Sequence, residues 1–524
     1  MTEKLQHVTR ILQTLKEEAK ERKLSPTERQ KTLETLKVYG RDPRNCDPLF
    51  TTEGIETLGK HGFDINADDV PSAREALRCL ANALLVVPKT RQMFVDAGLE
   101  YKAAEKLQGA LVDDQFLLAR ILFLITYDTT YNTGDADLMK LVEDKKIEAS
   151  IDEAIAGHAA RCSSSSKSPA PSAMDDMALE EILKLMFNFS HYVKEAKNGL
   201  FIKSVPNMFT ILQHKDLSPF PLRPPITNLI NALLNIDLTK CQDSDFPPEM
   251  RLISTEKLIE VLDKSIDPQF TKLGAKTAEN FDDHGKPLIT LLHKVIQTAD
   301  EGVVNKLKVR LLPSIDERNQ PLGKGTTLPA RLLQLTTSAS TPNTRESISW
   351  LLFELSGNDA AEFINNIGYG YASGFLVTHN IPIPASSFDK NSGTRQVNPI
   401  TGQTLDSEPP VDDPFEGMTQ EEKEREAERL FVLFERQDPL VKFRSSPVIR
   451  AFEEVVEVLE QRRRGWRRWR RRVREKLGRL KKTGVVDIKN PVETAFHEGR
   501  FQELPDDEEE DSDDEVEGKG KGKQ

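Results

Sequence analysis

Hydrophobic residues along this chain recur with the period of an α-helix, and one short helical pattern is repeated. Four copies of it, each combining an apolar stripe with a cation or an asparagine, span Leu77–Leu85, Ala119–Ile125, Leu183–Phe189 and Ile226–Asn235. Matched positions in the first two copies lie 42 residues apart, and those in the last two lie 43 apart. The middle step of 64 residues contains a Ser-rich loop, 163–172, that accounts for the excess. A period of about 40–47 residues in helical sequence is typical of HEAT and armadillo repeats.

The pattern therefore predicts an all-α fold, an armadillo/HEAT-like superhelix with a C-terminal extension. In chain order we expect the superhelix at 1–380, an irregular linker or surface strap at 381–415, a helical extension at 416–436 and 480–502, and a disordered acidic tail at 503–524. Pro, Gly, Asn and Ser replace the helical period in the strap, and the tail has too few apolar residues to fold alone. Such superhelices usually bind another protein on an extended concave surface.

Two helix starts are marked by capping residues. Ser25 precedes Pro26, which combines a favoured N-cap with proline at the first helical position. Thr419 is followed three residues later by Glu422, the spacing of a capping box. We therefore expect helices to begin at Pro26 and directly after Thr419.

A row of polar side chains recurs within the four copies, on helices that are otherwise apolar. Residues four apart share one face of a helix, and asparagine is a poor helix former, so its recurrence needs a reason. The row comprises Arg78, Asn82, Arg120, Lys184, Asn188, Asn231 and Asn235. One interpretation is that these side chains cap loops or face solvent. The other is a ladder in a concave groove that hydrogen-bonds a peptide backbone or receives a terminal carboxylate.

Composition favours a helical protein of the cytoplasm. The 524 residues are 38% hydrophobic, 30% charged and only 6% aromatic, which suits well-solvated helices. The first residues are charged, without the apolar core of a secretory signal, and runs such as Ile121–Ile125 are far too short to cross a bilayer. Cys46, Cys79, Cys162 and Cys241 lack metal-ligand spacing and are expected to be free thiols. We therefore expect no membrane span, no metal and no disulfide.

Motifs of catalysis are absent or imperfect. Gly368–Gly370 with Gly374 resembles a dinucleotide fingerprint, but its spacing is wrong and it follows a helix, so a helix end and a turn are favoured. Gly323–Thr327 lacks the upstream glycine of a P-loop and has Gly325 where Ser or Thr must meet magnesium. The sequence therefore predicts neither an enzyme nor a bound cofactor.

Charge is strongly segregated near the end of the chain. Residues 503–517 include 11 acids, and Ser512 lies among them in a context that acidophilic kinases favour. Residues 462–482 include 13 basic residues and one acid. Ser512 is therefore a candidate phosphorylation site in a tail that is either regulatory or simply solubilising.

Several motifs of the C-terminal half occur together in a fixed order. They are Leu351–Leu355, Phe363–Gly370, Ala372–Leu376, Asn398–Gly402 and Glu416–Glu424. In these motifs, and in Glu75–Leu80 and Arg120–Leu124, the chain resembles the synembryn family (resistance to inhibitors of cholinesterase). The resemblance covers most of 1–436 and again 480–504, and Gly484–Asp487 with Asn490–Glu493 makes it closest to fungal members.

The resemblance implies a non-receptor guanine nucleotide exchange factor and folding chaperone for heterotrimeric G-protein α subunits. Family members hold the C-terminal helix of the α subunit in the concave groove, and the segment after the solenoid reaches the nucleotide-binding domain. Animal members have an acidic phosphorylated stretch before the Asn-Pro-x-Thr-Gly motif, whereas Ser386–Gly393 here is not acidic. Phosphorylation control of this strap is therefore not carried over. The expected location is the cytoplasm, with recruitment to the cell cortex left open.

Two other protein classes could use parts of this sequence. An armadillo-type peptide-binding adaptor or nuclear transport scaffold is the alternative, but it needs acidic residues and tryptophans beside the asparagines, and the solenoid contains only Trp350. Nucleic-acid binding would rest wholly on the basic block, and we do not expect it. Family resemblance stops at Arg436 and resumes at Leu480, so the basic insertion 437–479 is either a translated intron or dispensable insertion, or a genuine nucleic-acid or membrane-surface patch.

Overall fold

The computed structural model describes residues 2–65, 69–133, 138–163, 171–193, 199–217, 220–244, 246–267 and 275–383, together with Asn398, Gly402–Thr404 and Thr419. The chain divides into two compact units, Met1–Asp413 and Pro414–Gln524. The predicted helical extension (416–436 and 480–502), the helix start expected after Thr419, the basic insertion (437–479) and the acidic tail (503–524) with Ser512 lie outside the described residues. The helices of the described residues all belong to the first unit.

The N-terminal part of this unit consists of helices joined by short connections. They are α1 (Glu3–Glu21), α2 (Pro26–Tyr39), the 3-10 helix η1 (Asp47–Phe50), α3 (Thr52–Gly59), the π-helix η2 (Lys60–Ile65), α4 (Val70–Val86), α5 (Lys89–Asp96), α6 (Leu99–Leu107), α7 (Val112–Ile125), α8 (Thr130–Thr133), α9 (Met139–Glu143), α10 (Ile147–Ser163) and α11 (Ala173–Tyr192).

The remaining described elements continue in the same manner. They are η3 (Ile202–Ser204), α12 (Val205–His214), α13 (Ile226–Asn235), η4 (Leu238–Lys240), α14 (Pro248–Ser265), α16 (Ala275–Thr298), α17 (Glu301–Leu311), η5 (Asp316–Asn319), α18 (Leu328–Thr336), α19 (Pro342–Leu355), α20 (Ala360–Ile367) and α21 (Tyr369–Thr378). No β-strand occurs among the described residues, although Thr404 forms an isolated bridge.

Capping side chains fix where several helices begin. The Ser25 hydroxyl accepts from the Glu28 N–H while the Glu28 carboxylate accepts from the Ser25 N–H, and Pro26 occupies the first helical position. Ser172 and Asp175 form the same reciprocal pair at the start of α11. These bonds satisfy helix N–H groups that have no partner within the helix. The predicted helix start at Pro26 is therefore confirmed.

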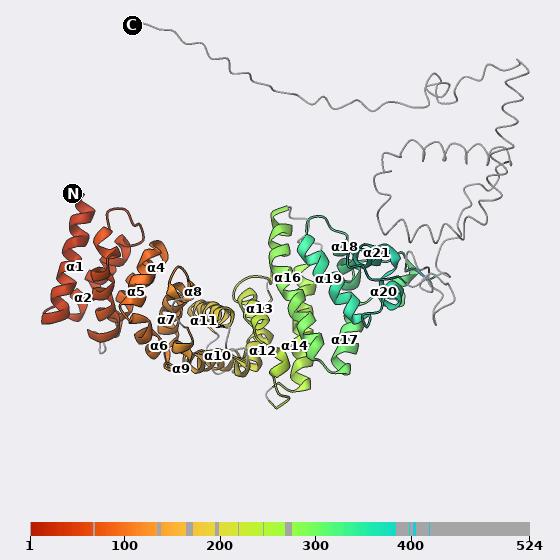
Figure 1. The fold of residues 1–524 in the computed structure, drawn as a ribbon, viewed down its shortest axis with the longest axis horizontal. Helices are drawn as coiled ribbons and strands as arrows, with labels where there is room; N and C mark the ends of the chain where they lie inside the picture. Colours follow the sequence, from red (N-terminus) through yellow and green to blue (C-terminus); the bar gives the residue numbers. More distant parts are fainter. Residues whose placement is uncertain are drawn as a thin grey trace, which may run out of the picture. The chain divides into compact units, whose positions relative to one another are not determined.

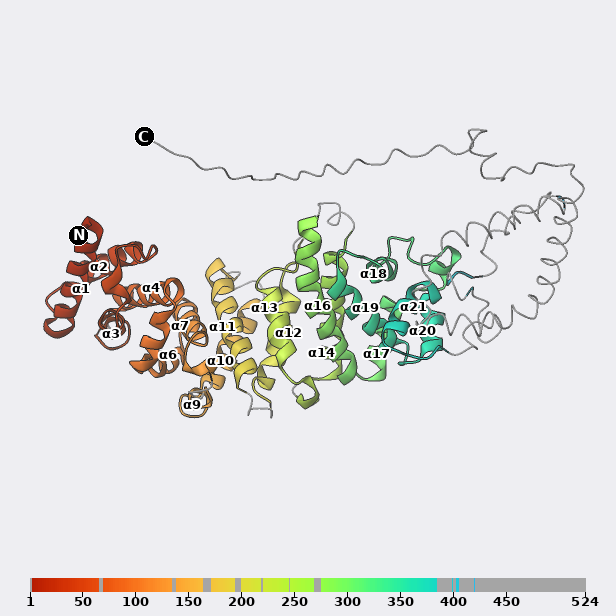
Figure 2. The same cartoon turned by 45° about the horizontal axis from the view of Figure 1, so that its top comes forward.

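The four sequence copies lie on α4, α7, α11 and α13, and these helices pack on one another in series. Along the array α4 contacts α2 and α7, α11 contacts α7 and α13, and α16 contacts α13 and α19. Figures 1 and 2 show the helices following one another in chain order. One hydrophobic core extends from Val8 to Leu376. The predicted all-α helical-repeat fold is confirmed.

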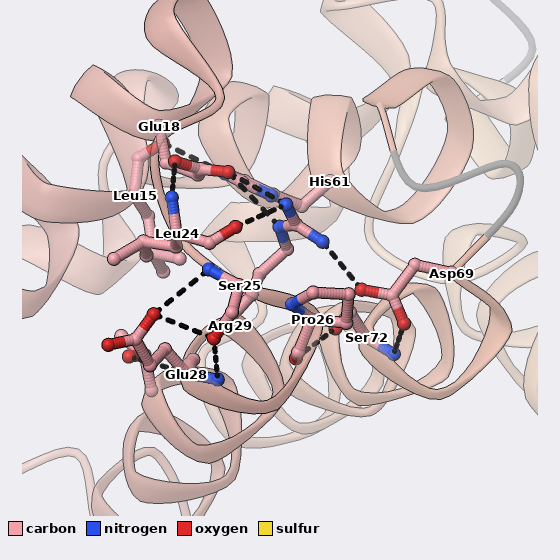
Figure 3. Close-up of polar contacts among 11 residues, drawn as sticks. Leu15, Glu18, Leu24, Ser25, Pro26, Glu28, Arg29, His61, Asp69 and Ser72 are labelled. Carbon is pink, nitrogen blue, oxygen red and sulfur yellow. Dashed lines mark hydrogen bonds and ion pairs between the residues drawn. The ribbon is translucent and has the colours of Figure 1, made fainter.

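A buried polar network fastens the first helices together (Figure 3). Arg29 on α2 donates to Glu18 on α1 at 2.8 Å and to Asp69, the N-cap of α4, at 2.6 Å. Burial favours the neutral form of Glu18, but the Leu24 N–H and the Arg29 guanidinium outweigh it and hold the pKa of this carboxyl below its ordinary value. Losing one member of a buried ion pair typically costs about 3–5 kcal/mol, so the network fixes the start of the array.

Candidate partner-binding site

All seven residues of the predicted polar row lie on the four helices that carry the sequence repeat. Arg78 and Asn82 are on α4, Arg120 is on α7, Lys184 and Asn188 are on α11, and Asn231 and Asn235 are on α13. Their surroundings differ sharply, however, because some meet buried carboxylates, one is itself buried, and two have no hydrogen-bond partner among the described residues.

Arg78 belongs to a cluster centred on a buried acid, Glu75. The Glu75 side chain is 7% exposed and lies one helical turn before Arg78, which donates to it at 2.5 Å. Lys37, on the neighbouring helix α2, approaches the second Glu75 oxygen at 2.6 Å. One carboxylate therefore faces two cations, and the Arg78 side chain remains 35% exposed.

The same arrangement recurs around Glu181 on α11. This side chain is 6% exposed and accepts from Lys184, three residues later, at 3.1 Å. Arg120 reaches it from α7 at 3.3 Å and also lies over the Phe116 ring at 5.8 Å. Arg120 and Lys184 keep about a third of their side-chain surface exposed, at 32% and 35%.

Each cluster is thus a carboxylate shared by two cations. Glu180 also interacts electrostatically with Lys184, so only the cluster around Glu75 has one positive charge in excess. A buried acid beside each cation fixes where the cation points, and a pre-oriented donor loses less conformational freedom when it binds an anion. The Arg78, Arg120 and Lys184 side chains each stay about a third exposed to solvent. The two clusters, defined by Lys37, Glu75 and Arg78 and by Arg120, Glu181 and Lys184, are therefore suited to receive a carboxylate; we call them the cation clusters.

Asn188 has a different role, because it is only 2% exposed. Its amide nitrogen donates to the Thr126 hydroxyl at 2.6 Å, and its oxygen accepts from the Tyr127 hydroxyl at 3.3 Å. Thr126 and Tyr127 directly follow α7, so Asn188 ties α11 to the end of that helix. Because the amide of Asn188 already hydrogen-bonds these two hydroxyl groups, it is not available to a bound peptide. We therefore leave Asn188 out of the proposed binding surface.

The other asparagines of the row are more accessible. Asn82 and Asn231 are half-buried, and no hydrogen bond of either amide is formed within the described part of the chain. Asn235 is exposed and donates to the Phe187 carbonyl at the distance of 3.2 Å. The amides of Asn82 and Asn231 are therefore the members of the row for which hydrogen bonding to a peptide stays a prediction.

An apolar row accompanies the polar row, three residues further along each helix. Leu85 on α4 is 45% exposed, and Phe123, Phe187 and Leu234 lie three residues after a polar-row residue on α7, α11 and α13, each half-buried. Within the repeat Phe123 matches Phe187, whereas Leu85 and Leu234 lie one helical turn later. Phe123 lies edge-on to Tyr127 at 5.3 Å between ring centroids. A partner that meets both rows would need one apolar and one polar side, which describes an amphipathic helix.

Sequence reasoning missed the two buried acids, although a signal was present. Glu75 and Glu181 each precede a cation of the row by three residues, the spacing of neighbours on a helix surface. Lys37 could not have been found in this way, because it lies before the first repeat copy.

Other chemistry is sparse in the described part of the chain. The four cysteines are free thiols in the structure, and burial raises the pKa of Cys46 and Cys162. The described residues contain no group of three or more His, Cys, Asp or Glu side chains arranged to hold a metal ion. Among them, no helix is both long and apolar enough to cross a membrane.

Comparison with known proteins decides the family. The model of the family described as guanine nucleotide exchange factor synembryn matches residues 32–500. This chain belongs to the synembryn family. Three similar relatives, all named Chaperone Ric-8A, come from Gallus gallus (25% identical over 475 residues), Macaca fascicularis (26% over 455) and Danio rerio (24% over 463). Each of these comparisons covers 79% of this chain and 82% of the synembryn relative.

Proposed function

We propose that this chain is a guanine nucleotide exchange factor and folding chaperone for heterotrimeric G-protein α subunits, and that it acts in the cytoplasm. Family membership supports the exchange activity, and the names of the relatives support the chaperone activity. The free thiols agree with a reducing compartment. In this proposal the C-terminal helix of the α subunit binds across α4, α7, α11 and α13.

The two cation clusters support this mode of binding. A C-terminal helix ends in a carboxylate and presents partial negative charge at its last carbonyl groups. The partly exposed cations beside Glu75 and Glu181 complement that end, and the apolar side chains Leu85, Phe123, Phe187 and Leu234 complement the apolar side of the helix. Charge-assisted hydrogen bonds of this kind contribute about 1.5–3 kcal/mol each.

Exchange in this proposal needs no contact between the repeat helices and the nucleotide. A protein that binds the nucleotide-free α subunit more tightly than the GDP form must weaken GDP binding by the same factor, because the two equilibria are linked. GTP reverses the complex by the same linkage. We assign to the segment after the repeat helices the contacts with the nucleotide-binding domain that distinguish the two states.

The test neutralises one cation in each cluster, as Arg78→Gln with Lys184→Gln. Charge reversal to Glu is unsuitable, because it would place a second carboxylate beside a buried one and unfold the site. With Gln, Lys37 still pairs with Glu75 and Arg120 still pairs with Glu181. The ligand is a peptide with the sequence of the last helix of the α subunit, which we call the α-subunit peptide. Losing two charge-assisted contacts should raise its dissociation constant about a hundredfold or more.

A matched control exists on α14, where Glu260 also lies between two cations. Lys257 and Lys264 approach it at 3.1 and 3.0 Å, and Lys264 is 45% exposed. Lys264→Gln should therefore leave peptide affinity and GDP release unchanged. Amidating the C-terminus of the peptide should weaken binding to the wild type but not to the double variant. A folded double variant that binds both peptides like the wild type would refute the assignment of the clusters.

The peptide adaptor for basic cargo is disfavoured by the same geometry. Such a site needs exposed acids, whereas Glu75 and Glu181 are buried and already paired with cations. A basic cargo peptide in the same binding assay should show no saturable binding.

A further inference from the structure

Beyond the last helix of the array, the described chain returns and docks on the 3-10 helix η5. The N–H and the hydroxyl of Thr404 both donate to the carbonyl oxygen of Arg318, at 2.8 Å each. The docked segment is closed by two backbone bonds, from the Asn398 N–H to the Gln403 carbonyl and from the Gly402 N–H to the Asn398 carbonyl. We call the contacts of these residues with η5 the clamp.

Arg318 is the centre of the clamp. This residue is only 2% exposed. Its guanidinium donates to the Gly402 carbonyl at 3.0 Å and to the Asn366 carbonyl, near the end of α20, at 2.8 Å. Gln403, itself 4% exposed, donates to the Asn319 carbonyl at 3.2 Å. A buried guanidinium is thus held by carbonyl groups from segments that lie 48 and 84 residues away in the chain.

Gly402 allows the backbone of the docked segment to lie close to Leu322 and Gly368. Its φ of +70° is in the left-handed region that favours glycine. A Cβ at this position would lie 2.3 Å from Leu322 Cδ1 and 3.6 Å from Gly368 Cα. Leu322 Cγ would also lie 3.0 Å from this Cβ, and the Leu322 side chain is buried, so turning one methyl group alone does not relieve the clash. A side chain at position 402 would therefore undock the segment.

We propose that the clamp is a positioning device for the second unit of the chain, with Arg318 and Gly402 as its positioning residues. This inference rests on the proposed function, in which the segment after the repeat helices contacts the nucleotide-binding domain of the α subunit. The second unit starts at Pro414, ten residues after Thr404. Measured instead from Thr378, where α21 ends, the connection is 36 residues long.

The length of that connection sets the effective concentration of the second unit at a partner already bound to the helices. For a connecting chain of n residues this concentration falls roughly as the −3/2 power of n. Lengthening the connection from 10 to 36 residues therefore lowers it roughly sevenfold by this scaling. The clamp leaves the cation clusters untouched, so it acts on the step that follows capture of the partner.

The experiment undocks the clamp by two independent routes in the full-length protein. Gly402→Ala introduces the clashing Cβ, and Thr404→Pro removes the N–H that donates to Arg318. Both variants should bind the α-subunit peptide as tightly as the wild type, while the GDP-release rate at saturating concentration falls roughly sevenfold. Hydrogen exchange at the backbone amide of residue 402 in each variant, which donates to the Asn398 carbonyl, and at the Thr404 amide of Gly402→Ala, should be at least about tenfold faster.

Gly357→Ala is the matched control, because Gly357 has a φ of +74° but a Cβ there would meet nothing within 4 Å. It imposes the same backbone strain outside the clamp and should behave as the wild type. Deleting residues 385–397 in the Gly402→Ala background shortens the connection to 23 residues and should restore the rate roughly twofold.

The outcomes separate the two proposals. An unchanged GDP-release rate in both undocking variants overturns the inference, and so does an equal loss of peptide affinity, because a general structural defect would then explain the rate. If the wild-type protein itself releases no GDP from any α subunit, the proposed function fails, whatever hydrogen exchange shows for the clamp.

Discussion

Replacing Asn188 with alanine tests whether this residue of the polar row stabilises the helix array or binds the partner. The substitution removes the bonds to the Thr126 and Tyr127 hydroxyls at a site that is 2% exposed. Two hydrogen bonds contribute about 0.5–1.5 kcal/mol each, and an unsatisfied buried group adds about 1–3 kcal/mol. We therefore expect a local destabilisation of about 2–6 kcal/mol where α11 meets the end of α7. Affinity for the α-subunit peptide should be unchanged.

Native-state hydrogen exchange is the suitable assay, because stability in a repeat array is local rather than all-or-none. A loss of about 2 kcal/mol corresponds to roughly thirtyfold faster exchange of the amides in α7 and α11. Asn235→Ala is the control, since this exposed residue makes one bond to the Phe187 carbonyl and should cost below about 0.5 kcal/mol. Weakened peptide binding with unchanged exchange protection in Asn188→Ala would refute the structural role.

Two further predictions concern other parts of the chain. Glu100 is 2% exposed, and burial raises its pKa from 4.5 to about 7 despite the Tyr131 hydroxyl that donates to it. The stability that this group contributes is present below pH 4.5 and is lost as pH rises to about 7, so Glu100→Gln should stabilise the protein by up to about 3 kcal/mol at pH 8 and little at pH 4.5. Equal shifts in melting temperature at both pH values would contradict this. The composition of the insertion 437–479 predicts one of two results: the mature transcript lacks the insertion, or deleting the insertion from the protein leaves GDP release intact. The prediction is wrong if the mature transcript encodes residues 437–479 and their deletion abolishes GDP release.

The sequence was sufficient for the architecture because the relevant signals are local. Helical periodicity with a repeat of 42–43 residues predicted α4, α7, α11 and α13, and the Ser25–Pro26 pair predicted the start of α2. The helical period and the helix cap depend only on residues within one or two turns of each other, and the repeat is visible in the sequence without knowledge of any tertiary contact.

The site could be predicted only in part, because its decisive contacts link residues far apart in the chain. Lys37 pairs with Glu75 across 38 residues, and Arg120 pairs with Glu181 across 61. A repeat pattern aligns cations but gives no information about which neighbour neutralises them. The clamp illustrates the same limit, since nothing around Arg318 indicates that its side chain binds a carbonyl 84 residues away.

The cation clusters and the clamp should affect exchange in kinetically distinct ways. Contacts that the C-terminal helix of the α subunit makes equally in the GDP-bound and nucleotide-free states increase affinity but cannot promote release, since only differential binding shifts an equilibrium. The cluster variant Arg78→Gln with Lys184→Gln should therefore raise the concentration of exchange factor needed for half-maximal GDP release and leave the saturating rate nearly intact. The clamp acts after capture, so Gly402→Ala should lower the saturating rate at an unchanged half-maximal concentration. If both variants moved the same parameter, capture and release would not be carried by separate parts of the chain.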